Sequence, residues 1–186
     1  MRLNRRPRTV HVFADGYLLF NGRRIACSLG SGGVVATKIE DDGGTPSGLF
    51  PVRRLWFRSD RVHVQTAIRC QPILRTHGWC DDPASGLYNR PFRLPAHVSH
   101  ERLYRRDRLY DLVLTIGHND SPARAGGGSA IFVHVQPEND AATAGCIAPS
   151  RDDLIWLLAR LRPGDMFRVH PPGSGSVRFP PRRVLP

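Results

Sequence analysis

The stretch Ala130-Ile-Phe-Val-His134-Val, joined by a polar loop to Thr143-Ala-Gly145-Cys146-Ile-Ala148, decides how this chain is organised. Its first half is typical of a buried strand that carries one histidine, and its second half of a small-residue turn that presents one cysteine. A thiol is mostly protonated at neutral pH, so a reactive Cys146 needs a base, and His134 is the candidate. Gly145 lets the main chain approach a substrate carbonyl, so the amides of Gly145 and Cys146 are candidates for an oxyanion hole.

The elements around this stretch predict a mainly β domain. Asp15-Gly16 and Asn21-Gly22 are typical of two-residue hairpin turns, and they separate β-prone runs at 9–14, 17–20 and 23–29. Further strands are expected at 49–57, 61–68, 110–117, 130–136 and 165–170. One helix is expected over about 150–161, from the N-cap Ser150 to the stop at Pro163-Gly164. Because it begins just after Cys146, its N-terminus is a candidate to lower the thiol pKa.

A second segment, Gly43-Gly-Thr45-Pro46-Ser-Gly48-Leu-Phe, follows the first strands. Together with the histidine strand, Gly145-Cys146-Ile and the closing strand after the helix, it resembles the L,D-transpeptidases of the YkuD type. These enzymes remodel bacterial peptidoglycan through a cysteine nucleophile. The resemblance implies a YkuD-like β-sandwich-type catalytic domain over residues 1–170, followed by an irregular Pro/Arg-rich tail over 171–186. Without the resemblance, an ordinary turn is the better interpretation of Thr45–Gly48.

The resemblance implies an acyltransferase that forms cross-links between stem peptides during cell wall biogenesis, in the periplasm or cell envelope. Cys146 would attack a donor carbonyl, His134 would handle the proton, and an amine of a second stem would resolve the thioester. No metal or organic cofactor is expected, and β-lactams of the carbapenem type are candidate inhibitors. Water as the acceptor would make the enzyme an L,D-carboxypeptidase, and a protein acceptor would make it an anchoring enzyme. Which stem-peptide carbonyl is attacked stays open.

Three departures from the family pattern indicate a divergent branch. Most members carry Ser-His-Gly-Cys followed by a hydrophobic residue and Arg, whereas this chain has Thr143-Ala-Gly145-Cys146-Ile-Ala148. The second histidine and the arginine of the motif are therefore missing, and Val135 stands where many members have Gly. His134 is left as the motif histidine available as a base, and the usual recognition of a donor carboxylate by arginine is not expected.

The segment between about residues 79 and 104 is dense in aromatic and charged side chains, which suits peptide recognition. Arginine can bind carboxylates bidentately, and Asp81, Asp82 or Glu101 can meet an ammonium group. The candidate substrate-binding residues are Thr143, Tyr88, Arg90, His100, Tyr104 and His118. His118 is also a candidate to orient His134. Solvated loop residues are an equally good interpretation of the same composition.

The other cysteines and histidines leave alternatives open. Cys70, His77, Cys80, His97 and His100 lie close in sequence, but their spacing fits no zinc motif, so no metal is expected. In an oxidising compartment Cys70 and Cys80 could form a small-loop disulfide. Cys146 as an inert core cysteine and His134 as a satisfied core histidine are the alternatives to a catalytic pair.

The charge of the chain favours anionic partners in general. The formal net charge is +11 and the pI is about 10.8, and Lys38 is the one lysine among 27 basic residues. A basic nucleic-acid-binding module is therefore the competing hypothesis, and it predicts steeply salt-dependent binding. The arginines are spread along the chain and match no nucleic-acid motif, so no nucleic acid partner is expected. The N-terminus shows no signal-peptide pattern, which conflicts with an envelope location.

Overall fold

The computed structural model describes residues 6–174, and this part of the chain is mainly β, as predicted. Its large sheet has the strand order β12-β11-β6-β14-β1-β2-β3-β13, with β7 paired to β6. The strands are β1 (Thr9–Phe13), β2 (Tyr17–Phe20), β3 (Arg23–Ser28), β6 (Gly48–Phe57), β7 (Cys70–Pro72), β11 (Leu112–Ile116), β12 (Phe132–His134), β13 (Ala148–Pro149) and β14 (Met166–Val169). Within this sheet β1 pairs with β14 and β6 with β7 in parallel, and the other pairs are antiparallel.

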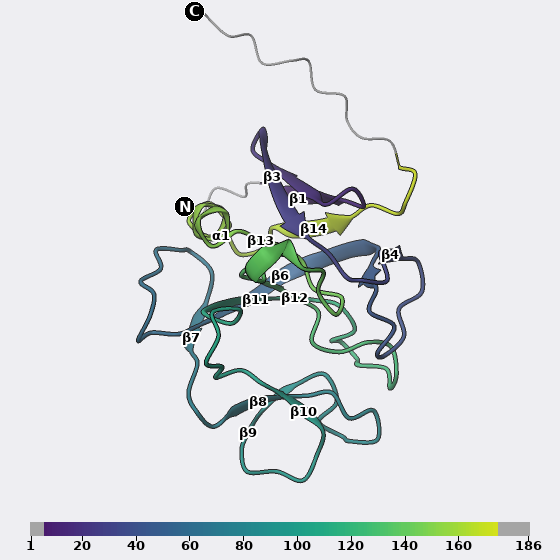
Figure 1. The fold of residues 1–186 in the computed structure, drawn as a ribbon, viewed down its shortest axis with the longest axis vertical. Helices are drawn as coiled ribbons and strands as arrows, with labels where there is room; N and C mark the ends of the chain where they lie inside the picture. The colour runs from purple at the N-terminus through teal and green to yellow at the C-terminus, as the bar shows by residue number, and fades with distance from the viewer. Residues whose placement is uncertain (1–5, 175–186) are drawn as a thin grey trace, which may run out of the picture.

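The two ends of the large sheet meet at Ile147. Its N–H donates to the carbonyl of Phe132 at 2.9 Å, and its carbonyl accepts from the His134 N–H at 3.1 Å. The sheet therefore curls into two layers around one apolar core, with β1, β3 and β14 above β6, β11 and β12 in Figure 1. Cys146 directly precedes Ile147, so this seam fixes the cysteine beside the histidine strand.

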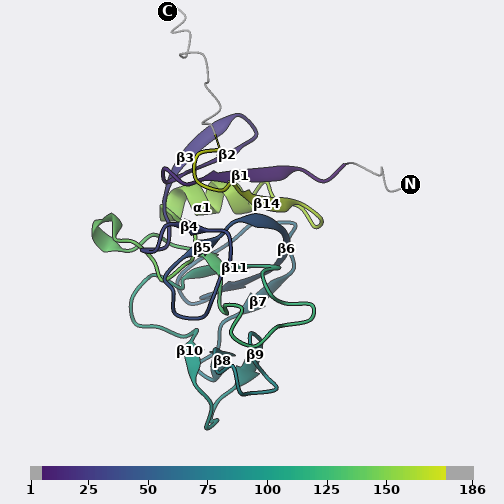
Figure 2. The ribbon, with the colours of Figure 1, turned by 90° about the vertical axis from the view of Figure 1, so that its right-hand side faces the viewer.

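Two small sheets complete the β structure. β4 (Val34–Val35) and β5 (Thr45–Pro46) pair in parallel. β8 (His77–Cys80), β9 (Pro91–Arg93) and β10 (His100–Arg102) form a separate three-stranded sheet, which stands apart from the large one in Figures 1 and 2. A second buried cluster joins the segment around this sheet to β6, β11 and β12; it contains Trp56, Ile73, Trp79, Leu103, Tyr110, Val113, Phe132 and Cys146. The cysteine thus lies where the small sheet packs on the large one.

Helix α1 (Arg151–Leu158) matches the predicted helix at its start. The Ser150 hydroxyl accepts from the Asp153 N–H at 3.2 Å, which is the expected N-cap bond. The helix ends three residues before the expected position, because the Arg160 N–H bonds the Leu157 carbonyl and tightens the last turn. No helix among the described residues has the length and apolar content needed to cross a membrane.

The prediction of a strand at 61–68 is wrong. The segment is a loop, because the N–H groups of Arg61 and Val62 both turn back to the Arg58 carbonyl. Val62 and Ile68 are still buried, and the Thr66 hydroxyl donates to the last turn of α1 at the Leu158 carbonyl, 2.7 Å away. Apolar alternation in this segment therefore reflects packing on the core and not strand pairing. Of the predicted tail, residues 171–174 contain a turn and 175–186 lie outside the described residues.

Candidate active site

The Cys146 thiol is held by the main chain of the segment that leads into β12. The Phe132 N–H donates to Sγ at 3.3 Å, and the thiol donates to the Ala130 carbonyl at 3.2 Å. The residue is 7% exposed. Within residues 6–174 no hydrogen bond joins Sγ to His134.

Burial raises the pKa of Cys146 to about 12, and the negative charge of Glu101 acts in the same direction. The Phe132 N–H and the charge of Lys38 oppose this shift but do not reverse it. The prediction that the helix N-terminus lowers the thiol pKa is therefore not met. The short strand β13 lies between Cys146 and the first turn of α1. The thiol is therefore neutral at physiological pH.

His134 is buried, and its orientation is fixed by its neighbour. The ring Nδ1 lies 2.7 Å from the carbonyl oxygen of Val135. A carbonyl can only accept, so Nδ1 carries the proton and, in the neutral ring, Nε2 keeps the lone pair. Burial lowers the pKa of His134 to about 4, so the imidazole is neutral at physiological pH and able to accept a proton at Nε2.

Tyr110 connects the histidine to the cysteine. Its ring meets the His134 ring edge to face, with centroids 5.4 Å apart, and it also packs in the buried cluster that contains Cys146. Phe132 and His134 occupy alternate positions of β12, so they point to the same face of the strand. Sequence reasoning missed Tyr110, since nothing in the sequence sets it apart from other aromatic residues in this region.

The loop that carries Cys146 is held in its conformation by Thr143. Its hydroxyl donates to the Cys146 carbonyl at 2.7 Å and accepts from the Gly145 N–H at 3.1 Å. The Gly145 amide is thus already engaged, whereas the Cys146 amide makes no hydrogen bond among the described residues. Gly145 has φ +132°, and a Cβ there would lie 2.7 Å from the Gly44 carbonyl oxygen, so the loop requires glycine.

The segment Gly43–Gly48 packs against the loop that carries Cys146. The Thr45 hydroxyl accepts from the Gly30 N–H at 2.8 Å, and the Ser31 N–H donates to the Thr143 carbonyl at 2.9 Å. A Cβ on Gly30 would lie 2.1 Å from the Gly43 carbonyl oxygen and 2.9 Å from the Gly145 Cα. The contacts of the segment Gly43–Gly48 are therefore structural. They keep the backbone at Gly30 close to that at Gly43 and Gly145, and the position of Cys146 depends on this packing.

A cavity of about 340 Å³ lies over the cysteine. Besides Cys146 it is bounded by Tyr110, by the segment Ser129–Ile131 and by the loop before β5. Its charged lining is Lys38, Glu40, Asp41, Asp81 and Glu101. The thiol is thus at the wall of a space large enough for a peptide side chain and the adjoining main chain.

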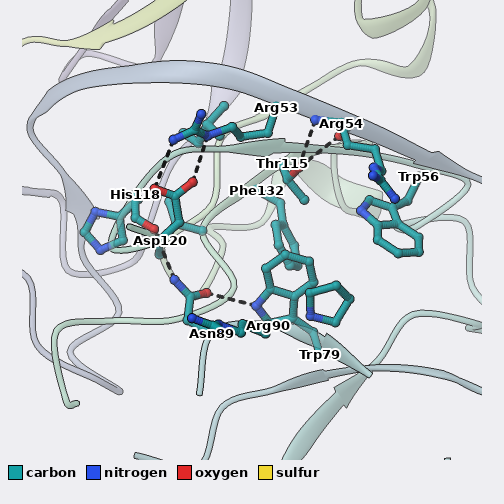
Figure 3. Close-up of a pocket in the computed structure, with 13 residues that line it drawn as sticks. Arg53, Arg54, Trp56, Trp79, Asn89, Arg90, Thr115, His118, Asp120 and Phe132 are labelled. Atoms are coloured by element: carbon teal, nitrogen blue, oxygen red, sulfur yellow. Dashed lines mark hydrogen bonds and ion pairs between the residues drawn. The ribbon is translucent and has the colours of Figure 1, made fainter. Parts of the chain in front are cut away.

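A second pocket, of about 290 Å³, is drawn in Figure 3. Ile131 belongs to the lining of both pockets. Trp56 and Trp79 contribute aromatic faces, and the basic side chains are Arg53, Arg54 and Arg90. Asn89 orders this wall, because its Oδ1 accepts from the Trp79 Nε1–H at 2.9 Å and its Nδ2 donates to the His118 carbonyl at 3.1 Å (Figure 3). Arg90 and His118, both predicted from the sequence, lie here and not in the thiol cavity.

The remaining candidate substrate-binding residues are engaged within the protein. The Tyr88 hydroxyl donates to Glu40, and the His100 Nδ1 bonds the Val98 carbonyl at 2.7 Å. Two guanidinium groups lie over the Tyr104 ring, with the Cζ atoms of Arg58 and Arg75 at 3.7 Å and 4.7 Å from its centroid. His118 bonds the Gly127 carbonyl through Nε2, so it does not orient His134.

The positions of the other cysteines bear on the alternatives that the sequence left open. All four cysteines are free thiols, and Cys70 is exposed whereas Cys80 is buried, so they form no disulfide in this structure. Within residues 6–174 no group of three or more His, Cys, Asp or Glu side chains is arranged to hold a metal ion.

Comparison with known proteins assigns the chain to a family. The model of the YkuD family, the L,D-transpeptidase catalytic domain, matches residues 3–170. The chain therefore belongs to the L,D-transpeptidase catalytic domain family, as its sequence motifs predicted.

Among solved structures, the chain is similar to an L,D-transpeptidase from Mycobacterium smegmatis, with 16% sequence identity over 88% of this chain. The TM-score is 0.39, and the chain covers 58% of that protein's length. A search of curated proteins gave no significant match.

Proposed function

We propose that the chain is a peptidoglycan L,D-transpeptidase in which Cys146 carries the acyl group as a thioester and His134 is the base. One observation carries this proposal: Cys146 and Tyr110 line the same 340 Å³ cavity, and the Tyr110 ring packs on His134, whose Nδ1 is fixed by a carbonyl. Membership of the L,D-transpeptidase family supports an enzyme over a nucleic-acid-binding module.

The reaction starts from two neutral groups, since burial raises the pKa of Cys146 and lowers that of His134. His134 Nε2 accepts the thiol proton as sulfur attacks the donor carbonyl, which requires the donor to bring the two groups together. The developing oxyanion is met by the open Cys146 amide, while the Gly145 amide is already bonded to Thr143. The thioester forms as the leaving amine takes the proton from His134.

The thioester is then resolved by an acceptor. An amine of a second stem peptide gives a cross-link, and residues 1–170 form the catalytic unit that does this in the periplasm or cell envelope. Water as acceptor gives L,D-carboxypeptidase activity, and a protein amine gives anchoring, all on the same acyl-enzyme.

Purified muropeptides test the proposal. The wild-type protein is expected to convert them to cross-linked dimers that mass spectrometry resolves, and a Cys146→Ala protein, shown by circular dichroism to be folded, is expected to leave them unchanged. Carbapenem acylation gives a second readout, because its strained amide offers the same kind of carbonyl. Cross-linking by the Cys146→Ala protein at the wild-type level would remove the nucleophile assignment.

A further inference from the structure

A third cavity, of about 450 Å³, is lined mainly by arginine side chains. Its lining is Arg61, Arg106, Arg108, Asp111 and Arg151, and none of these residues lines either of the two pockets described above. Four guanidinium groups and one carboxylate give this arginine cavity a formal charge of +3. Like charges gathered around one space repel one another, so the arrangement favours an anion inside it.

Arg61 and Asp111 form the frame of the arginine cavity. The Asp111 side chain is 4% exposed and accepts from the Arg61 guanidinium at 2.9 Å. The same guanidinium donates to the carbonyls of Asp107 at 2.7 Å and Arg106 at 3.0 Å. The main chain that carries Arg106 and Arg108 is thus bonded to Arg61, and the one carboxylate of the cavity is already neutralised by its ion pair.

The charges of the other three arginines of the cavity are unmatched. Arg106, Arg108 and Arg151 form no ion pair within residues 6–174. Asp107 lies between the first two in sequence, but it pairs with Arg105 at 2.8 Å. Arg106 and Arg108 are exposed, so their guanidinium groups are free to turn towards a ligand.

Arg151 gives a second, independent indication of an anion. Its Nη2 reaches the Arg61 carbonyl at 3.5 Å, which is the limit of a hydrogen bond, and its Nε is closed to solvent without an acceptor. The guanidinium has therefore lost part of its hydration and gained no negative charge in return, which is unfavourable. Of the acidic residues in the same helical turn, Asp153 pairs with Arg23 and Asp152 does not line the cavity.

We infer that Arg106, Arg108 and Arg151 bind the phosphate group of a phosphate monoester or pyrophosphate. The three outer oxygens of a phosphate dianion can accept from several guanidinium groups at once, and arginine matches this geometry bidentately. A single carboxylate has two oxygens and one charge, so it would leave most of the cavity charge unmatched. The inference goes beyond the proposed function and does not involve Cys146.

Isothermal titration with pyrophosphate, in a buffer free of phosphate and sulfate, tests the inference. The wild-type protein is expected to bind one pyrophosphate per chain, and acetate at least about tenfold more weakly. Arg108→Gln and Arg151→Gln are each expected to weaken pyrophosphate binding by about tenfold, because each removes charge-assisted hydrogen bonds. Circular dichroism checks that both variants are folded.

Arg168→Gln is the matched control for the loss of one positive charge. Arg168 is exposed on β14, forms no ion pair among the described residues and does not line the arginine cavity. Its substitution is expected to leave the affinity unchanged, as is Cys146→Ala. Absence of pyrophosphate binding, or equal affinities in the Arg108→Gln, Arg151→Gln and Arg168→Gln proteins, would overturn the inference. Loss of binding in the Cys146→Ala protein would also overturn it, since the anion would then lie in the thiol cavity.

A vesicle arm identifies the source of the phosphate group. Phosphatidylcholine vesicles contain either phosphatidic acid, a monoester, or the same share of phosphatidylglycerol, a diester, and cosedimentation measures binding. Preference for phosphatidic acid that is lost in Arg108→Gln assigns the site to a lipid headgroup. Pyrophosphate binding without vesicle binding assigns it to a soluble phosphate ester. Equal binding to both kinds of vesicle, unchanged in the Arg108→Gln and Arg151→Gln proteins, would indicate diffuse attraction by net charge and would contradict a monoester site.

Discussion

The Nδ1 of His134 donates to the carbonyl of its own neighbour, Val135, at 2.7 Å. This bond fixes the tautomer and leaves Nε2 as the acceptor nitrogen of a neutral ring. A histidine held in this way in an apolar strand is prepared to act as a base and needs no carboxylate to orient it.

Loss of this base is expected to slow acylation of Cys146 by about 10²–10⁴-fold. His134→Ala removes the ring and His134→Gln keeps a side chain of similar length, and both are compared with wild type by single-turnover acylation with muropeptide. Circular dichroism checks that each variant is folded. An unchanged rate in both variants would demote His134 to a structural residue of the core.

Stability is expected to fall as the pH drops from about 6.5 to 4. The pKa of His134 is lowered by burial to about 4 from an ordinary value of 6.5, so the unfolded chain binds a proton in this window that the folded chain does not. The full effect is on the order of 3 kcal/mol. Urea unfolding at several pH values measures it.

His11, His77, His118 and His170 also have lowered pKa values, so the difference between the wild-type and His134→Gln proteins is the relevant quantity. Parallel pH profiles for these two proteins would show that His134 titrates normally in the folded state.

The close approach at Gly30 predicts a strong effect of a single methyl group. In Gly30→Ala the Cβ would meet the Gly43 carbonyl at 2.1 Å, so the loop behind the nucleophile must shift, at a cost of about 2 kcal/mol or more. Thiol reactivity of Cys146 is expected to change with it. Gly86→Ala is the control, because a Cβ there meets no atom within 4 Å. Equal melting temperatures for the two variants would contradict this reading of the loop.

The Thr143 hydroxyl is expected to stabilise the loop that carries Cys146. Thr143→Val keeps the shape of the side chain but leaves the Gly145 N–H and the Cys146 carbonyl without their partner, at a cost of about 1–3 kcal/mol. Thr143→Ser retains the hydroxyl and is expected to retain most of the stability. Chemical denaturation measures the free energy of unfolding of both variants. A Thr143→Val protein as stable as the Thr143→Ser protein would show that these hydrogen bonds do not stabilise the loop.

The parts of the site that sequence predicted are local in the chain. His134 and Cys146 were recognisable because a strand and a small-residue turn each leave a short-range pattern, and the backbone bonds of Ile147 then bring these two segments together. Tyr110 and Glu40 left no such pattern, since their roles arise only when separate loops pack around the cavity. The prediction of a strand at 61–68 failed because buried and exposed residues alternate along this loop as they do along a strand.

The central claim is that Cys146 carries the acyl group between the two half-reactions. Rapid quenching of the wild-type protein with donor muropeptide, followed by intact mass and peptide mapping, measures this most directly. The account predicts one added acyl group, located on the peptide that contains Cys146 and absent from the Cys146→Ala protein. An acyl group on Cys27, Cys70 or Cys80, or cross-linked product formed by the Cys146→Ala protein, would contradict it.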